Sequence, residues 1–381
     1  MLFRSKCYEA LKPGGYLLAF GGSRTFHRMA VAIEDAGFEI RDTIMWLYGS
    51  GFPKSMNIGL AIDKKNKVES KIVGTKKTHD FSKHKGSMMS FSNTEEQETK
   101  TNVGRIKQAP NEWQGWGTAL KPAYEPIIVA RKPLSGTVVD NVLTYGVGGI
   151  NIDECRVETD DIMKPRNNKV GQNGIFNLCI KWWEPNELGR FPANVIHDGS
   201  DEVVSLFPYT ESGNLNEGHK RGDGTGNSFM GGGGMIQKNY GGDSGSASRF
   251  FYTAKASKKD RDEGLEFVGL EEQKTTRKNI HPTVKPCELM QYLVRLVSPK
   301  GATILDPFMG SGSTGKAVMF ENRERNANYK FIGIDLEEKY CQIAIARIDY
   351  ALNKFEYDYI KEKQEASLRG QANIFDFMEA N

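Results

Sequence analysis

The sequence has few cysteines and no long apolar run. Only five of the 381 residues are cysteine, and no two of them form a Cys-x-x-Cys pair. This spacing argues against a structural zinc site and against a disulfide framework, so reduced thiols are expected. No apolar run approaches the ~20 residues of a membrane-spanning helix. Residues Met1 to Lys6 lead into an amphipathic helix and not into a signal-peptide core. We therefore expect a cytoplasmic protein with no metal and no membrane contact.

A strong net charge is also lacking, since the formal value is only +3. Lysines nevertheless crowd between residues 64 and 85, within an insertion that we place at about 62–108. This insertion is either a track for DNA phosphates or a solvated segment. A second polar region, 213–248, is rich in glycine, asparagine and serine. It is either a loop that orders on DNA or a segment with too few apolar residues to fold alone.

The most informative stretch runs from Thr303 to Lys316. An apolar run ends in Asp306-Pro307-Phe308, passes through a loop with glycines at 310, 312 and 315, and leads into a helix-forming segment. This order predicts a strand, a tight turn and a helix N-terminus. Glycine lets the backbone approach a ligand closely, and the first N–H groups of the helix point toward it. The loop is therefore predicted to bind a small molecule.

Three kinds of ligand compete for this loop. A phosphate loop requires a serine or threonine after its lysine, but Ala317 stands there. A dinucleotide fingerprint is formally complete, with Gly310-x-Gly312-x-x-Gly315 followed by Asp335. However, too few strand-helix units follow Asp335 for a dinucleotide domain. S-adenosylmethionine needs the same turn and the same ribose-binding acid without a second mononucleotide half, so it is the ligand that the sequence favours.

The loop and its upstream segment resemble those of a known enzyme family. Asp306-Pro307-Phe308-x-Gly310-Ser311-Gly312, preceded by His281-Pro282-Thr283-Val284-Lys285-Pro286, resembles the amino-methylating DNA methyltransferases, which modify adenine N6 or cytosine N4. Further segments agree with this family: 11–15, 51–55, 121–126, 189–195 and 246–252. Together the segments span almost the whole chain. Their order is that of the permuted group, in which the cofactor loop lies near the C-terminus.

The resemblance implies a fold and an activity. The fold is a doubly wound, Rossmann-like α/β sheet, circularly permuted, lacking its N-terminal strands and carrying an inserted irregular α+β target-recognition region. The activity is that of a site-specific DNA methyltransferase of the restriction-modification type. It transfers a methyl group from S-adenosylmethionine to an exocyclic amine of a base flipped out of double-stranded DNA. Adenine N6 is preferred over cytosine N4.

The resemblance also assigns residues to cofactor binding. They are Asp306, Pro307, Phe308, Gly310, Ser311, Gly312, Asp335, His281, Pro282, Thr283 and Lys285. Asp335 is expected to bind the ribose hydroxyls, and segment 281–286 to close over the cofactor. Asp306 has an alternative role as a turn acid at a strand end, and Asp335 as a helix N-cap. The adjacent glycine loop favours the cofactor-binding role for both acids.

One feature of the family is missing. Its members carry out their chemistry on a strand that ends in Asp/Asn/Ser-Pro-Pro followed by an aromatic residue, N-terminal to the turn matched here by Lys12-Pro13-Gly14-Gly15. This sequence has no Pro-Pro pair, so its catalytic residues are unknown. Two hypotheses follow. The chain is either an active enzyme whose catalytic strand comes from another chain or a longer gene product, or an inactive remnant that still binds S-adenosylmethionine or DNA. Expected partners are therefore double-stranded DNA and a second chain, with a homodimer as a further arrangement.

Pro286-Cys287 suggests a rival within methyl transfer. Cytosine C5 methyltransferases attack their base with the cysteine of a Pro-Cys pair, because C5 is not nucleophilic until a thiolate adds to the ring. In that family the pair follows the cofactor loop, whereas here it precedes the loop. Cys287 is therefore predicted to be an ordinary helix residue. Trp182-Trp183 is predicted to be a core anchor of the recognition region.

The chain is predicted to have four parts. Residues 1–131 form the catalytic-side half of the methyltransferase domain, 132–279 the target-recognition region, 280–353 the S-adenosylmethionine-binding half and 354–381 a polar tail. Apolar periodicity predicts helices at 3–11, 25–36, 288–297, 313–320 and 337–352, and strands at 16–20, 39–48, 126–130, 303–305 and 331–334. The recognition region has short strand candidates at 138–143, 193–197 and 250–252.

Overall fold

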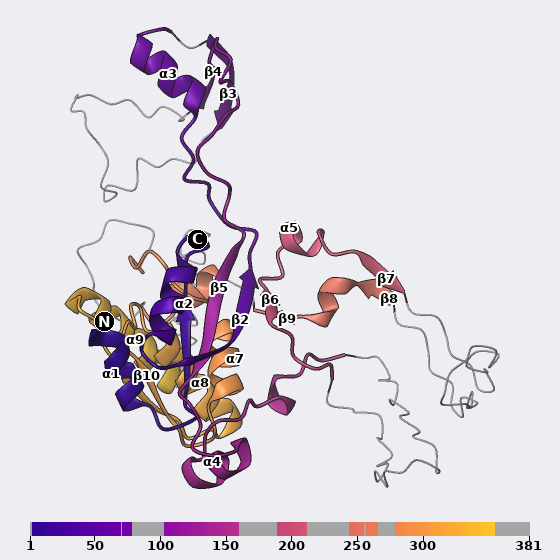
Figure 1. Cartoon of the computed structure of the whole chain (residues 1–381). Coiled ribbons are helices and arrows are strands. Elements are labelled where there is room, and N and C mark those ends of the chain that lie inside the picture. Colours follow the sequence, from indigo (N-terminus) through magenta and orange to yellow (C-terminus); the bar gives the residue numbers. More distant parts are fainter. Residues whose placement is uncertain are drawn as a thin grey trace, which may run out of the picture. The chain divides into compact units, whose positions relative to one another are not determined.

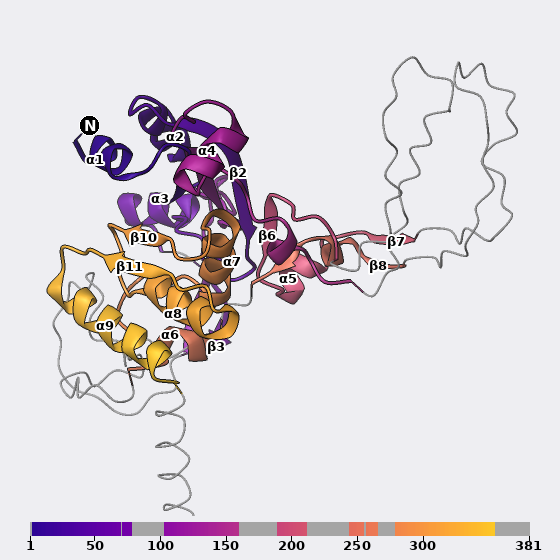
Figure 2. The same cartoon turned by 90° about the horizontal axis from the view of Figure 1, so that it is seen from below.

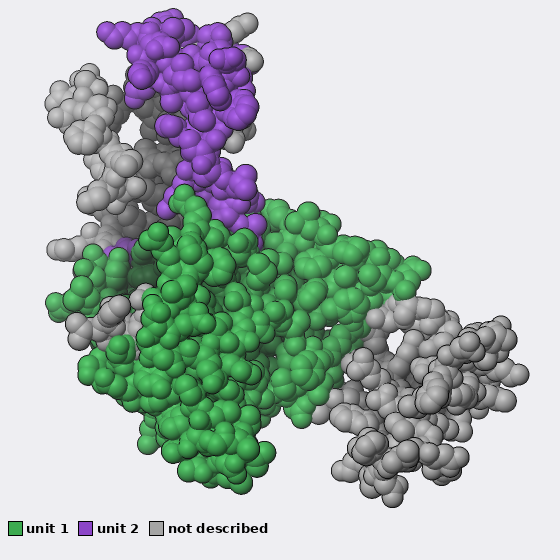
Figure 3. Space-filling view, in the orientation of Figure 1, with its two compact units in different colours: residues 1–49, 124–265, 281–381 green, residues 50–123, 266–280 purple. Residues whose placement is uncertain are grey.

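The computed structural model describes residues 2–69, 71–77, 103–159, 189–211, 244–254, 257–265 and 279–354. Contacts divide the chain into two compact units (Figure 1; Figure 3): unit 1 contains residues 1–49, 124–265 and 281–381, and unit 2 contains residues 50–123 and 266–280. The predicted anchor Trp182-Trp183, most of the polar region 213–248 and nearly all of the tail 354–381 lie outside the described residues. The boundaries of the four functional parts stay predictions.

The larger sheet of unit 1 has five strands. Their order is β1 (Tyr16–Phe20), β5 (Tyr124–Arg131), β2 (Glu39–Leu47), β6 (Val195–His197) and β9 (Tyr252–Thr253). β5 runs antiparallel to β1 and β2, while β6 and β9 continue the sheet parallel to β2. The last six residues of β5 are all buried, as expected for a strand covered on both faces.

Helices cover both faces of this sheet. Successive side chains of a strand point to opposite faces, and β5 divides accordingly. Ile127 and Val129 pack in one cluster with α7 (Cys287–Val297). Ile128 and Ala130 pack in another cluster with residues of α1 (Leu2–Ala10) and α2 (Phe26–Glu34). The result is the layered α/β arrangement expected from the sequence.

A second, two-stranded sheet carries the glycine loop. β10 (Thr303–Asp306) and β11 (Lys330–Gly333) pair in parallel. Figure 2 shows them beside α8 (Ser313–Arg325) and α9 (Glu338–Leu352). Ile304 and Phe331 pack with buried residues of α7 and α8. On the opposite face, Leu305 and Ile332 lie in register with each other and are 41% and 51% exposed.

The region predicted for target recognition, 132–279, is irregular within the described residues. It contains α4 (Val138–Tyr145), α5 (Asp201–Val204), β7 (Tyr209–Glu211), β8 (Ser244–Ser246), α6 (Lys258–Asp262), and the 3-10 turns Asp153–Cys155 and Ala247–Phe250. The strand predicted at 138–143 is wrong, because this segment forms α4. Thr137 and Asp140 form a capping box at its start, and Gly146 ends it in the left-handed conformation with φ 72°.

Unit 2 contains α3 (Ile58–Asn66) and an antiparallel pair of strands, β3 (Lys71–Lys77) and β4 (Val103–Gln108). Asn57 caps α3 by accepting a hydrogen bond from the N–H of Leu60. Lysines 83 and 85 of the predicted insertion lie outside the described residues. Across the described parts of both units, no helix is long and apolar enough to cross a membrane.

Candidate functional site

The glycine loop connects β10 to α8, as the sequence predicts. Gly310 and Gly312 adopt left-handed backbone conformations with φ 51° and 74°, which glycine reaches without a steric penalty. The N–H of Gly312 donates to the carbonyl of Met309 at 2.8 Å and closes the turn. A Cβ on Gly312 would lie 2.8 Å from Cα of Ala344 in α9. The second glycine is therefore also required for packing of the loop on that helix.

Two acids lie where the parallel strands β10 and β11 end. Asp306 Oδ1 accepts from the N–H of Phe308 at 3.1 Å, and its Oδ2 accepts from Thr314 Oγ1 at 2.5 Å. Asp335 Oδ2 accepts from the N–H of Gly310 at 2.9 Å, and its Oδ1 accepts from the N–H of Glu337 at 2.9 Å. Both carboxyl groups are therefore fixed at the rim of the loop.

His281 lies directly against the loop. A Cβ on Gly310 would come within 2.6 Å of His281 Nε2, and the imidazole meets the ring of Tyr340 edge-on with a centroid separation of 4.6 Å. The N–H of Thr283 donates to His281 Nδ1 at 3.3 Å. Burial lowers the pKa of His281, and the charges of Arg347 and Arg261 act in the same direction against the opposing effect of Asp335. The imidazole is therefore neutral near pH 7.

Lys285 contacts a different part of unit 1. Its Nζ pairs with Oε2 of Glu125 at 2.5 Å and lies 4.7 Å from the ring centroid of Phe20. Phe20 ends β1, so the lysine reaches the edge of the larger sheet. The structure thus brings His281 to the glycine loop, while Lys285, only four positions further along the chain, is engaged at β1 and β5.

The remaining predicted residues differ in how they face solvent. Phe308 is 72% exposed, whereas Ser311 is 3% exposed. The Ser311 hydroxyl accepts from Arg347 Nη1 at 3.0 Å inside the protein. Pro307 is half-buried and Pro282 is exposed. The side chain of Ser311 therefore faces the protein interior and not a ligand in the loop.

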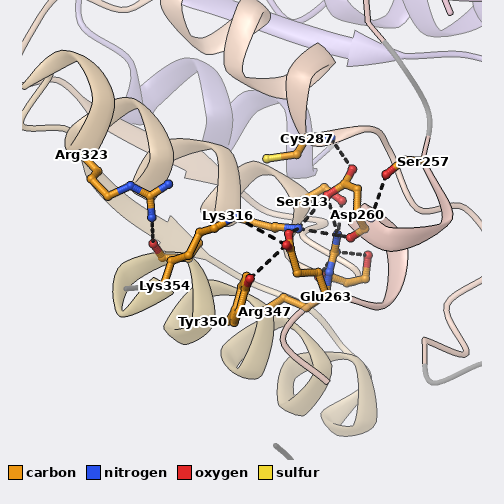
Figure 4. A network of polar contacts seen from close by, with 12 residues as sticks. Ser257, Asp260, Glu263, Cys287, Ser313, Lys316, Arg323, Arg347, Tyr350 and Lys354 are labelled. Carbon is orange, nitrogen blue, oxygen red and sulfur yellow. Dashed lines mark hydrogen bonds and ion pairs between the residues drawn. The ribbon is translucent and has the colours of Figure 1, made fainter. Parts of the chain in front are cut away.

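A buried network beneath the loop escaped the sequence prediction (Figure 4). It joins Lys316 of α8 and Arg347 of α9 to Asp260 of α6 and to Glu263 just beyond it. Lys316 and Arg347 are both 0% exposed. One signal in the sequence could have revealed Arg347. It lies on the buried face of α9, among the apolar residues Ile343, Ala344, Tyr350 and Ala351, where a charge requires a partner.

Cys287 does not have the environment of a nucleophile. It is 5% exposed at the start of α7. Burial raises the pKa of its thiol strongly, and the nearby carboxylate of Asp260 adds to this effect. A thiol in this state stays protonated, whereas nucleophilic attack requires the thiolate. The geometry therefore gives no support to a cytosine C5 mechanism.

Comparisons with known proteins place the chain in one family. The sequence model of the N6/N4 methyltransferase family, described as DNA methylase, matches residues 3–346. The chain is 38% identical over 100 residues to the type II methyltransferase M.BglI of Bacillus subtilis, covering 26% of this chain and 25% of that protein. It is 37% identical over 71 residues to the DNA adenine methyltransferase YhdJ of Escherichia coli (strain K12), covering 19% and 22%.

These alignments thus span a quarter or less of each relative's own length. Among solved structures, the crystal structure of the M1.HpyAVI-SAM complex matches with a TM-score of 0.34 and 15% sequence identity. That match covers 91% of this chain and 79% of the other.

Proposed function

Because the chain belongs to the N6/N4 DNA methylase family, we propose that it transfers a methyl group from S-adenosylmethionine to an exocyclic amine in double-stranded DNA. The arrangement of Asp306 and Asp335 around the glycine loop supports this function. The two acids end neighbouring parallel strands, and His281 packs on the loop between them. In this proposal Asp335 binds the ribose hydroxyls, while Asp306, Phe308 and the loop backbone contact the methionine part.

The residues around the loop fit S-adenosylmethionine. Gly310 presents bare backbone where a Cβ would collide with His281. Phe308, Ile334 and Leu336 are 72%, 53% and 96% exposed, which provides apolar surface for a purine ring. The carboxylates of Asp306 and Asp335 provide negative charge for a sulfonium and acceptors for hydroxyl groups.

The bound sulfonium supplies an already activated methyl group. Methyl transfer to an amine is an in-line displacement, which needs alignment of the two reactants more than a protein nucleophile. The chain's own contribution is then to hold the loop, the two acids and His281 in fixed positions. The hydrogen bonds that Asp306 accepts from Phe308 and Thr314, and that Asp335 accepts from Gly310, support this part of the proposal.

Calorimetric titration of the full chain tests this part of the proposal. S-adenosylmethionine should bind and NAD should not. Asp335→Ala should weaken binding by about tenfold or more, because hydrogen bonds to a charged group are lost. Asp35→Ala, at an exposed acid beyond α2, is the matched control and should bind as the unmodified chain does. Saturable NAD binding without S-adenosylmethionine binding would refute the proposal.

Adenine is the proposed target. One relative of this chain is named as a DNA adenine methyltransferase, which supports adenine N6 over cytosine N4. Nucleoside analysis of methylated DNA distinguishes the two products, and N6-methyladenine is expected. N4-methylcytosine as the sole product would redirect the proposal to cytosine without affecting the cofactor site.

We further propose that the catalytic strand lies outside these 381 residues, either in a longer gene product or in a second chain. In the described residues, β10 pairs only with β11, and β1 pairs only with β5. Both strands therefore have an open edge within unit 1. Helix α7 packs with residues of both sheets, since Leu289 shares a cluster with Leu18 of β1 and Val294 shares one with Ile304 of β10. A parallel strand placed between β10 and β1 would join the two sheets into one.

Backbone hydrogen bonding favours the addition of this strand to the sheets. A strand that pairs with two open edges gains several backbone hydrogen bonds, each of which contributes roughly 0.5 to 1.5 kcal/mol net. From either source, the expected segment is a parallel strand that ends in an Asp-Pro-Pro-Tyr-type sequence. The alternative is an inactive chain that retains S-adenosylmethionine or DNA binding.

Incorporation of labelled methyl groups into unmethylated DNA separates these alternatives. The purified chain alone should show no turnover. Addition of a family-type strand-helix polypeptide should restore it if the split arrangement is right. Robust turnover by the chain alone would contradict the missing-strand proposal. S-adenosylmethionine binding without turnover in either mixture would support the inactive alternative.

A further inference from the structure

The inner side of the glycine loop is held by a single side chain from α9. Arg347 Nη1 donates to the carbonyl of Ser311 at 2.6 Å, to Ser311 Oγ at 3.0 Å and to Ser313 Oγ at 3.2 Å. These two serines flank Gly312, where the chain turns left-handed and α8 begins. The guanidinium therefore fixes the backbone at the point where the loop becomes a helix.

A cation at this place is unfavourable without compensation. The N-terminus of a helix carries positive partial charge, Arg347 is 0% exposed, and a second buried cation, Lys316, lies one turn into α8. Burial of a charge costs several kcal/mol unless it is paired and hydrogen-bonded. The loop residues that Arg347 contacts offer only neutral acceptors, so the compensating charge must come from elsewhere.

The segment around α6 supplies that charge. Asp260 Oδ1 lies 2.7 Å from Lys316 Nζ and 3.8 Å from Arg347 Nη2, and its carbonyl accepts from Arg347 Nη2 at 3.1 Å. Its Oδ2 accepts from the N–H of Cys287 at 2.7 Å. Glu263 adds a second negative charge, and it pairs with Lys316 at 3.0 Å and with Lys354 at 3.6 Å. Figure 4 shows Asp260 between Lys316, Arg347 and Cys287, which belong to α8, α9 and α7.

The same segment also contacts His281, which packs on the outer side of the loop. Arg261 Nη2 donates to the carbonyl of His281 at 3.1 Å, and the His281 ring packs on Gly310. Gly264 seats the segment on α9, where an added Cβ would lie 2.7 Å from Cβ of Tyr350. This short segment therefore acts on both sides of the loop. Asp260 acts on the inner side through Arg347, and Arg261 acts on the outer side through His281.

We propose that Arg347, neutralised by Asp260, is the positioning residue that holds the glycine loop in the conformation that binds S-adenosylmethionine. Because Asp260 lies near the end of the predicted recognition region, this contact also links that region to the cofactor loop. The inference rests on the proposed function, and it differs from a general role in stability. Lys316 is equally buried and shares Asp260 with Arg347, but its side-chain hydrogen bonds go to Asp260 and Glu263 and not to the loop.

Lys316→Met is therefore the matched control for Arg347→Met. Both changes remove one fully buried cation from the same network and should lower the melting temperature by similar amounts. Only Arg347→Met should weaken S-adenosylmethionine binding, by about tenfold or more, because only it removes charge-assisted hydrogen bonds to the loop. Arg347→Lys keeps the charge, but lysine lacks the planar fork that reaches several loop acceptors at once. Compared with Arg347→Met, it should therefore restore the melting temperature more fully than the affinity for S-adenosylmethionine.

A second measurement does not depend on any ligand. Amide hydrogen exchange of the segment 309–316 in the ligand-free chain should accelerate in Arg347→Met and Arg347→Lys, but not in Lys316→Met. If the unmodified chain binds no S-adenosylmethionine, the proposed function fails while the exchange result still tests Arg347. Equal exchange in the loop of all variants, or affinity losses that simply follow the melting temperature in both Met variants, would overturn the positioning role.

Discussion

The backbone N–H of Gly310 donates a hydrogen bond to Oδ2 of Asp335 at 2.9 Å. This contact ties the loop after β10 to the acid that follows β11, although the two residues are 25 positions apart in the chain. The shape of the loop and the position of the proposed ribose-binding acid are therefore coupled. A change that displaces Gly310 should also displace Asp335.

Gly310→Ala tests this coupling. A Cβ at Gly310 would lie 2.6 Å from His281 Nε2, and the backbone there has φ 51°. Gly301→Ala is the matched control, because Gly301 also has a positive φ of 80° but no atom within 4 Å of the added Cβ. Both changes should cost about 1 kcal/mol in backbone strain. Only Gly310→Ala should also weaken S-adenosylmethionine binding, measured by calorimetry.

A double variant of Gly310→Ala with His281→Ala should recover part of that loss. Equal binding by Gly310→Ala and Gly301→Ala would contradict the prediction.

The lowered pKa of His281 predicts a dependence of stability on pH. Burial depresses the pKa of the folded state below that of the unfolded chain, so the unfolded state binds more protons in the window between the two values. The contribution of His281 is then fully present above about pH 6.5 and is lost as the pH falls through the folded pKa. The melting temperature of the unmodified chain should therefore fall more steeply between about pH 7 and pH 5 than that of His281→Gln.

His27→Gln is the control for that comparison, since His27 is exposed on α2. It should keep the slope of the unmodified chain. Parallel curves for the unmodified chain and His281→Gln would show that the imidazole does not contribute in this range.

Most of the fold could be predicted because its signals are local. The strands and helices around the glycine loop follow from apolar runs that end at glycine, proline or an acid. The predicted boundaries agree with the structure to within one residue, except that α8 continues to Arg325 and does not end at residue 320. The segment 138–143 was misjudged because its β-branched and apolar residues favour a strand. The capping box formed by Thr137 and Asp140 outweighed that preference.

The sequence predicts only those parts of the site whose residues lie close together in the chain. Asp306, Gly310 and Gly312 lie within one motif, but Arg347 contacts Ser313 and Asp260, which are 34 and 87 positions away. Such contacts depend on how α9 and α6 pack, which periodicity does not specify. Lys285 was assigned to the site together with its neighbours in sequence, which lie at the loop. Its own ion-pair partner, Glu125, is 160 positions away.

Removal of one partner from the buried pair between Arg295 of α7 and Glu321 of α8 should be strongly destabilising. Arg295 Nε lies 3.0 Å from Oε2 and Nη2 lies 2.5 Å from Oε1 of Glu321, with side chains 9% and 1% exposed. Glu321→Gln should lower the free energy of unfolding by about 3 to 5 kcal/mol, because it leaves a buried guanidinium without its counter-charge.

Two control variants test whether the unpaired charge causes the loss of stability in Glu321→Gln. The double variant Arg295→Met with Glu321→Leu should recover most of the loss, since apolar side chains of similar volume often replace a buried pair without cost. Glu9→Gln removes an exposed pair with Lys6, whose side chains are 68% and 61% exposed, and should change stability by less than about 1 kcal/mol. A double variant that is as unstable as Glu321→Gln would show that packing, and not the unpaired charge, sets the cost.

DNA binding by the recognition region and the lysine-rich insertion should depend strongly on salt. Lys64 and Lys65 lie in the last turn of α3 and Lys67 follows that helix, and all three are exposed. Each phosphate contact contributes about −0.9 to the slope of log affinity against log salt. Replacement of these three lysines by serine should therefore make the slope shallower by up to about 3 in gel-shift titrations.

The charge-matched control replaces Lys6, Lys330 and Lys339, exposed lysines of unit 1, and should leave the slope unchanged. An identical slope in both triple variants would remove the insertion from the DNA interface, and binding that does not respond to salt would argue against phosphate contacts altogether.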